Sequence, residues 1–251
     1  MRVLVVALAI LFFGNANTAS ATSPAGQGGL RFGYSRGFYR FSMAGPEIYM
    51  WRINNGYVPE DIGVLAIKEV KEPFGQLNQF NSLMAYTEFE GSGLTAEVGL
   101  ALRRSATDAV YTALVTGGVE EERREKVKLR YNQIFLTVGY RGAGSKLYLG
   151  GSLDIGMFSA WRKVNDGKWS PWFYSFKILG GDVTAKTPCA AVSLVASYDI
   201  SYFTLRVYSQ HALMNPTLNS ESGKYTNIPW SQKVFPISHI GLGLMFHIGG
   251  E

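Results

Sequence analysis

The most informative feature of this sequence is what it contains little of. There is one cysteine, Cys189, so the chain can form neither an internal disulfide nor a multi-cysteine zinc site. Charged residues make up only 17% of the chain. No run after the first 21 residues approaches the ~20 apolar residues of a membrane-spanning helix. If the mature chain enters a membrane, it must therefore do so as strands, because lipid offers no partners for free backbone groups.

The N-terminal residues have the pattern of a secretory signal peptide. Arg2 supplies a positive charge, Val3–Phe13 is an apolar run, and Ala19–Ala21 is a cleavage site of small residues. An anchoring helix is the alternative, but eleven apolar residues are too few to cross a bilayer. The sequence therefore predicts a signal peptide at residues 1–21 and one β-barrel domain at residues 22–251.

The hairpin Leu83–Arg103 carries the clearest periodicity. In its second half every other residue is aliphatic, and the residues between them are small or charged, including Glu97 and Arg103. A soluble β-sandwich could also alternate in this way, and it remains the alternative fold. Small residues interleaved with an acid and a base favour the narrow polar interior of a barrel whose aliphatic face meets lipid.

Eight segments have the length and alternation of barrel strands. They are Gly29–Ser35, Phe80–Phe89, Leu94–Ser105, Val127–Tyr140, Lys146–Ala160, Cys189–Tyr198, Tyr202–Ala212 and Ser238–Ile248. The fourth segment changes the phase of its alternation near Asn132, which predicts a β-bulge there.

The connections between these segments alternate between long and short. Residues 37–79, 106–126, 161–188 and 213–236 form long connections, which we interpret as loops, and all nine prolines lie outside the predicted strands. Bacterial outer-membrane barrels have an even strand number, tight periplasmic turns and long external loops. The sequence predicts an all-β, eight-stranded antiparallel transmembrane β-barrel in the outer membrane of a Gram-negative cell, with both termini periplasmic.

An eight-stranded barrel is just wide enough for side chains to fill it. Buried charges must be paired, so we expect Arg–carboxylate contacts across the interior. The predicted polar network comprises Arg31, Glu88, Glu97, Arg103, Asp154 and Arg206. Further interior candidates are Tyr86, Arg130, Tyr148, Tyr208, His239 and His247.

Aromatic residues gather in the predicted loops and at the outer strand ends. This predicts a loop interaction surface made of Trp51, Trp161, Trp169, Trp172, Phe173, Tyr174 and Trp230. In an adhesin or ligand-binding barrel, the segment Trp161–Tyr174 would be the binding site.

The sequence offers little to support catalysis. Some small outer-membrane barrels modify lipid A with a His and a Ser or an acid at the outer rim, and Ser209 and His211 are two residues apart on one face. The alternation of the segment Tyr202–Ala212 places both side chains on the lipid side, and no acid partner for the histidine is evident. His239 and His247 lack neighbours at metal-ligand spacing, so we expect no catalytic residue, metal or cofactor.

Charge gives a weak indication of partners. The formal net charge is +5, or +4 without Arg2, because 23 Lys and Arg then face 19 Asp and Glu. This excess favours contact with outer-membrane lipid and anionic lipopolysaccharide. It is too small to predict direct binding of nucleic acid.

Short motifs suggest a family. The chain resembles small eight-stranded outer-membrane proteins of the OmpA/OmpX kind. More narrowly, it resembles the TraO family of conjugal transfer proteins from Bacteroidota, through Leu30–Gly33, Gly37–Tyr39, Leu149–Ser152 and Gly241–Phe246. That resemblance implies a non-enzymatic envelope component, part of a conjugative transfer apparatus. The alternatives are a surface adhesin and a lipid A-modifying enzyme.

Overall fold

The computed structural model describes residues 29–39, 45–58, 64–91, 94–142, 144–171, 187–216 and 237–248. The predicted signal peptide, residues 1–21, lies outside these ranges, so its prediction stands as it was. No helix in the described ranges is long and apolar enough to span a bilayer.

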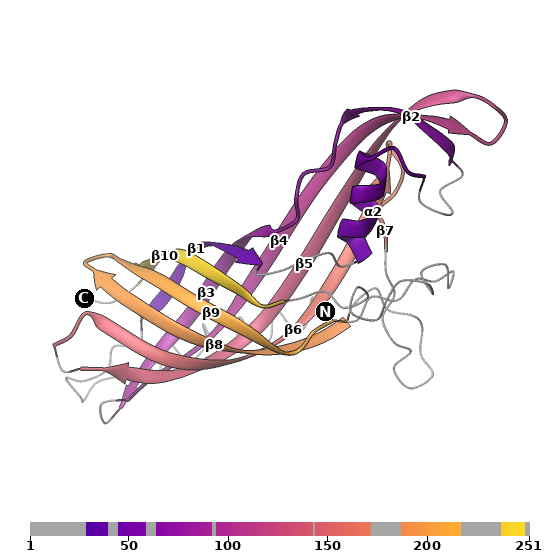
Figure 1. Cartoon of the computed structure of the whole chain (residues 1–251). Coiled ribbons are helices and arrows are strands. Elements are labelled where there is room, and N and C mark those ends of the chain that lie inside the picture. Colours follow the sequence, from indigo (N-terminus) through magenta and orange to yellow (C-terminus); the bar gives the residue numbers. More distant parts are fainter. Residues whose placement is uncertain are drawn as a thin grey trace.

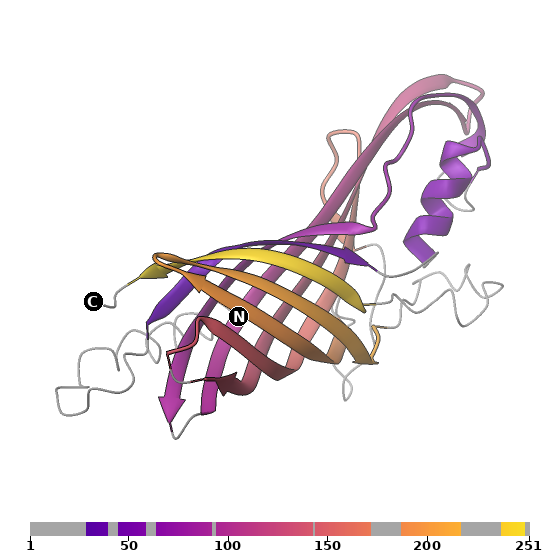
Figure 2. The ribbon, with the colours of Figure 1, turned by 60° about the vertical axis from the view of Figure 1, so that its left-hand side comes forward.

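Eight antiparallel strands close into a barrel (Figures 1 and 2). They are β1 (Leu30–Tyr39), β3 (Gln79–Gly91), β4 (Leu94–Val115), β5 (Glu120–Arg141), β6 (Leu147–Val164), β8 (Thr187–Ile200), β9 (Phe203–Met214) and β10 (His239–Ile248). Each pairs with the next, and β1 pairs with β10 to complete the circle. The predicted eight-stranded antiparallel barrel is confirmed.

The two ends of the barrel differ. Short connections join β3 to β4, β5 to β6 and β8 to β9 at one end, here named the tight-turn end. Leu30 and Ile248 pair at this end, so the barrel begins and finishes there. The other end, here named the extension end, carries the longer connections, as the sequence predicts.

Two regions predicted as loops contain regular structure. The segment 37–79 holds a helix, α2 (Gly45–Asn54), and a strand, β2 (Val64–Glu72). The segment 106–126 belongs to β4 and β5, which are 22 residues each and project beyond the other strands (Figure 1). A two-residue strand, β7 (Ser170–Pro171), also pairs with the end of β6.

The projecting part of β4 and β5, together with β2 and α2, is here named the extension. Its hairpin is continuous with the barrel wall, since pairing runs without a shift from Leu94↔Tyr140 to Leu114↔Glu120. Gly117 and Gly118 form the turn with φ of 106° and 76°, a region that glycine enters without strain. The predicted charged loop is therefore a β-hairpin.

The predicted bulge near Asn132 is wrong. Asn132 pairs in register with Leu102 and Met157, and β5 points its odd-numbered residues inward along its whole length. What changes is the environment of the two faces. Toward the tight-turn end the aliphatic side chains point outward, whereas in the extension Val127 and Leu129 point inward and are buried.

The extension has an apolar core of its own, which continues into the mouth of the barrel. Tyr49, Met50 and Ile53 of α2 pack there among buried residues of the long hairpin, including Tyr111 and Leu129. Figures 1 and 2 both show α2 lying beside the projecting strands. The helix and hairpin thus form a packed unit.

Two prolines occur in strands, contrary to prediction. Pro171 lies in β7, and Pro188 is the second residue of β8. Pro188 faces β6 but has no partner on β9, because pairing with β9 begins only at Ala190. A proline tolerates such a half-edge position because its missing N–H removes few ladder bonds.

Candidate functional site

The interior of the barrel is crossed by ion pairs, beginning near the tight-turn end. Arg31 contacts Glu88 and Asp199, each at 2.6 Å, and Arg141 contacts Glu88 at 2.6 Å. Arg141 also pairs with Asp199, which closes a ring of two cations and two carboxylates. Each arginine contacts both carboxylates, so the cluster links β1, β3, β5 and β8.

Sequence reasoning predicted Arg31 and Glu88 as interior residues but missed Arg141 and Asp199. Both were placed at the edges of tight turns, where a charged side chain normally points into water. One feature of the sequence could have identified them: Arg141 and Asp199 each lie where a strand meets a tight turn, and both turns are at the same end of the barrel. A base and an acid at the same level of the barrel could form an ion pair.

A second ion pair lies in the middle of the barrel. Arg206 Nη1 and Nη2 lie 3.0 and 2.8 Å from the two carboxylate oxygens of Glu97, in a bidentate arrangement. The guanidinium carbon of Arg206 is 4.7 Å from the ring centre of Tyr86. Both charged side chains are buried, so the pair and the aromatic face replace the water that each charge loses.

The remaining two members of the predicted network do not pair with each other. Arg103, only 1% exposed, lies among the rings of Phe80, Tyr131 and Tyr208 at 5.2 to 5.5 Å. No carboxylate within the described ranges is at ion-pair distance from it. The expected Arg–carboxylate contact is replaced here by cation–π contacts.

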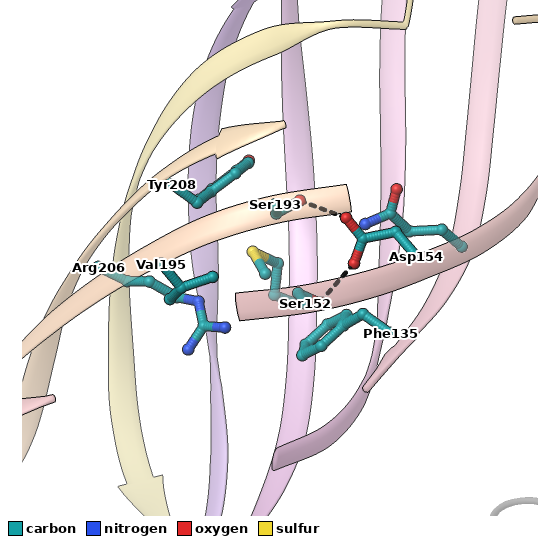
Figure 3. A pocket seen from close by; sticks show the side chains of 9 residues that line it. Phe135, Ser152, Asp154, Ser193, Val195, Arg206 and Tyr208 are labelled. Carbon is teal, nitrogen blue, oxygen red and sulfur yellow. Dashed lines mark hydrogen bonds between the residues drawn. The ribbon is translucent and has the colours of Figure 1, made fainter. Parts of the chain in front are cut away.

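Asp154 is instead held by hydroxyl groups (Figure 3). Ser152 Oγ donates to it at 2.7 Å, and Ser193 donates to its other oxygen. A cavity of about 10 Å³ lies beside this group, lined among others by Phe135, Arg206 and Tyr208. That is room for about one water molecule, so side chains fill the barrel at this level.

Other interior candidates divide by face. Tyr86, Tyr148, Tyr208 and His239 are buried on the inner face, and His247 lies on it beside the ion-pair ring. Arg130 was assigned to the wrong face. It is an even-numbered residue of β5 and therefore points outward, because the strand does not change phase at Asn132.

The outer wall of the barrel is a belt of exposed apolar side chains. Its middle is aliphatic, with Leu83, Leu136, Leu153, Ile155, Leu194, Val207 and Leu242 all 40% exposed or more. Aromatic residues flank it, with Phe89, Tyr140, Tyr198 and Tyr202 toward the tight turns and Tyr34 and Phe38 toward the extension. Aliphatic belts between aromatic girdles are typical of barrels in a bilayer.

The predicted loop aromatics do not form one described surface. Trp51 on α2 is 48% exposed and stacks on Tyr57 at 5.7 Å. Trp161 lies on β6 and donates from Nε1 to Ser159 at 3.2 Å, and Lys128 lies 5.4 Å from the ring of the exposed Trp169. The predictions for Trp172, Phe173, Tyr174 and Trp230 fall outside the described residues.

A buried carboxylate anchors the extension, and sequence reasoning missed it. Glu125 is fully buried and accepts hydrogen bonds from Tyr49 Oη at 2.8 and 3.0 Å and from Tyr111 Oη at 3.0 Å. Arg162 Nε pairs with the same carboxylate. Burial and the neighbouring carboxylate raise the pKa of Tyr49 well above its ordinary value, so this hydroxyl stays a donor.

Glu125 was missed because it lies within the predicted loop 106–126, in a run of charged residues that is typical of a solvated surface. Only alternation along a continuing strand would have separated it from its exposed neighbours Glu120 and Arg124. Its position also explains α2, since Tyr49 ties the helix to β5.

Ser209 and His211 lie on the outer wall, as their alternation predicts. Ser209 Oγ and His211 Nε2 are 3.2 Å apart and no described hydrogen bond or ion pair joins the imidazole to a carboxylate. Within the described ranges, no group of three His, Cys, Asp or Glu side chains is arranged to hold a metal ion.

Known proteins resemble this chain in structure and not in sequence. No family model matches the chain, and no curated protein matches it. Seven chains of solved structures match; one is Ail, the attachment invasion locus protein of Yersinia pestis, crystallised with the heparin analogue sucrose octasulfate. The similarity covers 89% of this chain and 99% of that one, at 10% identity and a TM-score of 0.43. The resemblance to the TraO family therefore stays a prediction.

Proposed function

We propose that this chain is a non-enzymatic outer-membrane barrel that holds the extension outside the cell as an interaction module. In this orientation the tight turns and both ends of the barrel face the periplasm. The observation that carries the proposal is that the interior is filled while β4 and β5 continue past the wall and form a second core with α2.

The belt supports a place in the membrane. Leu194 is 69% exposed, and the exposed aliphatic residues Leu149, Leu153 and Val207 lie diagonally to it on the two neighbouring strands. In water, a continuous apolar girdle of this extent would cause aggregation, whereas in a bilayer it is the favoured surface. The all-strand wall leaves no unpaired edge within the lipid.

The closed interior supports a role other than transport. The ion-pair ring and the pair Arg206–Glu97 cross the lumen, and the cavity beside Asp154 admits about one water molecule. A pore would need a continuous hydrated path, which these contacts obstruct. These contacts support our proposal that the surfaces outside the membrane carry the function.

The extension has the properties of a binding module. Glu125 fixes α2 against the hairpin, so the surface is held in shape before any partner arrives. It presents exposed apolar and aromatic side chains at Trp51, Tyr57, Leu65 and Val119. Exposed apolar groups on a rigid support are typical of contact sites for proteins or other ligands.

The proposal is tested by placing a photo-reactive amino acid at single positions in growing cells. Leu65 and Val119 report on the extension, and Lys146 at the tight-turn end is the matched control. We expect discrete adducts from the extension positions in cells whose barrel fractionates with the outer membrane and shows heat-modifiable migration. Adducts from Lys146 alone would contradict the assignment of function to the extension.

The partner is either another envelope component or a ligand at the cell surface, and the adducts distinguish these two. Membership of a conjugative apparatus rests on the sequence resemblance alone. Lipid A modification rests on the pair Ser209 and His211 alone. Neighbouring transfer genes would support the first prediction, and a changed lipid A mass spectrum would support the second.

A further inference from the structure

A row of cations crosses the outer wall where the apolar belt ends. Arg36, Asn81, Arg104 and Arg130 are successive partners across β1, β3, β4 and β5. Lys128 lies two residues beyond Arg130 on the same face of β5. Neighbouring strands are about 4.8 Å apart, so the three arginines and Lys128, here named the basic row, form a compact cationic surface.

The basic row borders the belt directly. Two residues nearer the tight turns, the same outward faces present Tyr34 on β1 and Leu83 on β3, both exposed. On β5 the outward face continues through Asn132 to Ile134, which is also exposed. The cations therefore lie at the level where acyl chains end and lipid head groups begin.

The charge of the row is not compensated by nearby acids. Arg104 and Arg130 are direct cross-strand partners, an arrangement that is unfavourable for two like charges. Among the described residues, no carboxylate lies at ion-pair distance from any member of the row. Asp108, farther out on β4, is already paired with Arg124 at 3.0 Å.

A further observation indicates a site for an anion. Arg130 Nε is buried and has no hydrogen-bond partner among the described residues. An anion with several acceptor oxygens, bound between these side chains, would supply that partner and offset the repulsion between the cations.

Phosphate fits this surface best. Arginine donates paired hydrogen bonds in a geometry that matches phosphate oxygens, and lysine adds a flexible charge. Because the row adjoins the acyl-chain belt, the phosphate nearest to it belongs to a lipid whose tails cover Leu83 and Ile134. In the outer leaflet of an outer membrane that lipid is the phosphorylated glycolipid of lipopolysaccharide.

We propose that the basic row binds the head-group phosphates of lipid A at the outer leaflet. This inference rests on the proposed outer-membrane location and orientation. It adds a defined lipid site to the barrel wall, separate from the partner surface of the extension.

The test uses the full mature chain, refolded in phospholipid nanodiscs and titrated with diphosphorylated lipid A. One variant, R104Q/K128Q/R130Q, removes three cations from the row. The matched control, K68Q/K146Q/K168Q, removes three exposed cations elsewhere. We expect the row variant to bind at least about tenfold more weakly and the control to stay within about twofold of the parent.

Ligand controls separate the possible sources of the anion. Dephosphorylated lipid A should bind the parent as weakly as diphosphorylated lipid A binds the row variant. Inorganic phosphate and heparin should compete poorly at concentrations that match the lipid. Full competition by either would overturn the lipid assignment, and so would unchanged lipid binding by the row variant or an equal loss in the control.

If the row variant does not fold, a second variant, R104K/R130K, still tests the proposal. It keeps the positive charges but loses the paired hydrogen-bond donors of arginine. We expect intermediate affinity from this variant and the same heat-modifiable migration as the parent; parental affinity would contradict bidentate recognition. A different result would contradict the proposed function, namely absence of the chain from the outer membrane. A chain located there that does not discriminate lipid A phosphates overturns only the basic row.

Discussion

Arg206 and Glu97 meet in the middle of the barrel, and each buries its charge against the other through two parallel hydrogen bonds. They come from β9 and β4, which are not neighbours in the wall. The pair is therefore a strut across the lumen, and its geometry makes the closed interior testable.

Removing one partner of this pair should be costly. Arg206→Met leaves the Glu97 carboxylate buried and uncompensated, and we expect a loss of about 3–5 kcal/mol in the free energy of unfolding. Urea titration of the refolded barrel, followed by heat-modifiable migration, measures it. Adding Glu97→Gln to Arg206→Met should recover part of the loss, and strictly additive effects would show that the two residues are not coupled.

The closed interior also predicts the electrical behaviour of the purified protein. Reconstituted in a planar bilayer, the parent should give no large and stable open channel, because ion pairs and aromatic rings cross the lumen at successive levels. A steady conductance in the parent would contradict this interior. As a comparison, Glu97→Ala/Arg206→Ala should be more permeable than Ser209→Ala, which alters only the outer wall.

The extension should loosen without loss of the barrel when Glu125 is changed. Glu125→Gln removes the charge that Arg162 pairs with and weakens the hydrogen bonds from Tyr49 and Tyr111, at a cost of about 1–3 kcal/mol to the packing of α2. Hydrogen exchange should rise in residues 45–54 while β8 and β9 keep their protection.

Glu122→Gln is the matched control for this change, because Glu122 is exposed and, among the residues that the structure describes, forms an ion pair only with Lys71. Equal exchange in both variants would show that Glu125 does not anchor the helix. Global unfolding in Glu125→Gln would show instead that the extension and the barrel form one cooperative unit.

The sequence predicts the barrel well because alternation, turn spacing and membrane chemistry agree there. Leu94 and Val98 point outward while Glu97 and Arg103 point inward, as the alternation predicts for each residue. The extension was not predicted because that rule reverses. Val127 and Leu129 face inward once β5 leaves the belt, so a continuous strand looks like a broken one.

The partners of the inward-pointing side chains were harder to predict than which side chains point inward. Strand alternation places Arg103 and Asp154 inward, but their partners depend on the tilt and stagger of strands distant in the sequence. Arg103 meets aromatic rings and Asp154 meets two serines, although a simple count of charges favours an ion pair. Arg141 and Asp199 were concealed by their place beside turns.

The belt itself distinguishes a membrane barrel from a soluble one through Leu194→Arg. Leu194 is 69% exposed, so in a water-soluble protein a charged replacement would change stability by at most about 0.5 kcal/mol. If the belt faces acyl chains, the same change places a cation in hydrocarbon, at a cost of about 2–4 kcal/mol near the midplane.

Leu65→Arg is the matched control, because Leu65 is 59% exposed but lies on β2 in the extension. We expect a clear loss for Leu194→Arg and almost none for Leu65→Arg when both are unfolded by urea from lipid vesicles. Equal, small effects would remove the physical basis for placing the belt in a bilayer, and with it the argument that lipid head groups lie beside the basic row.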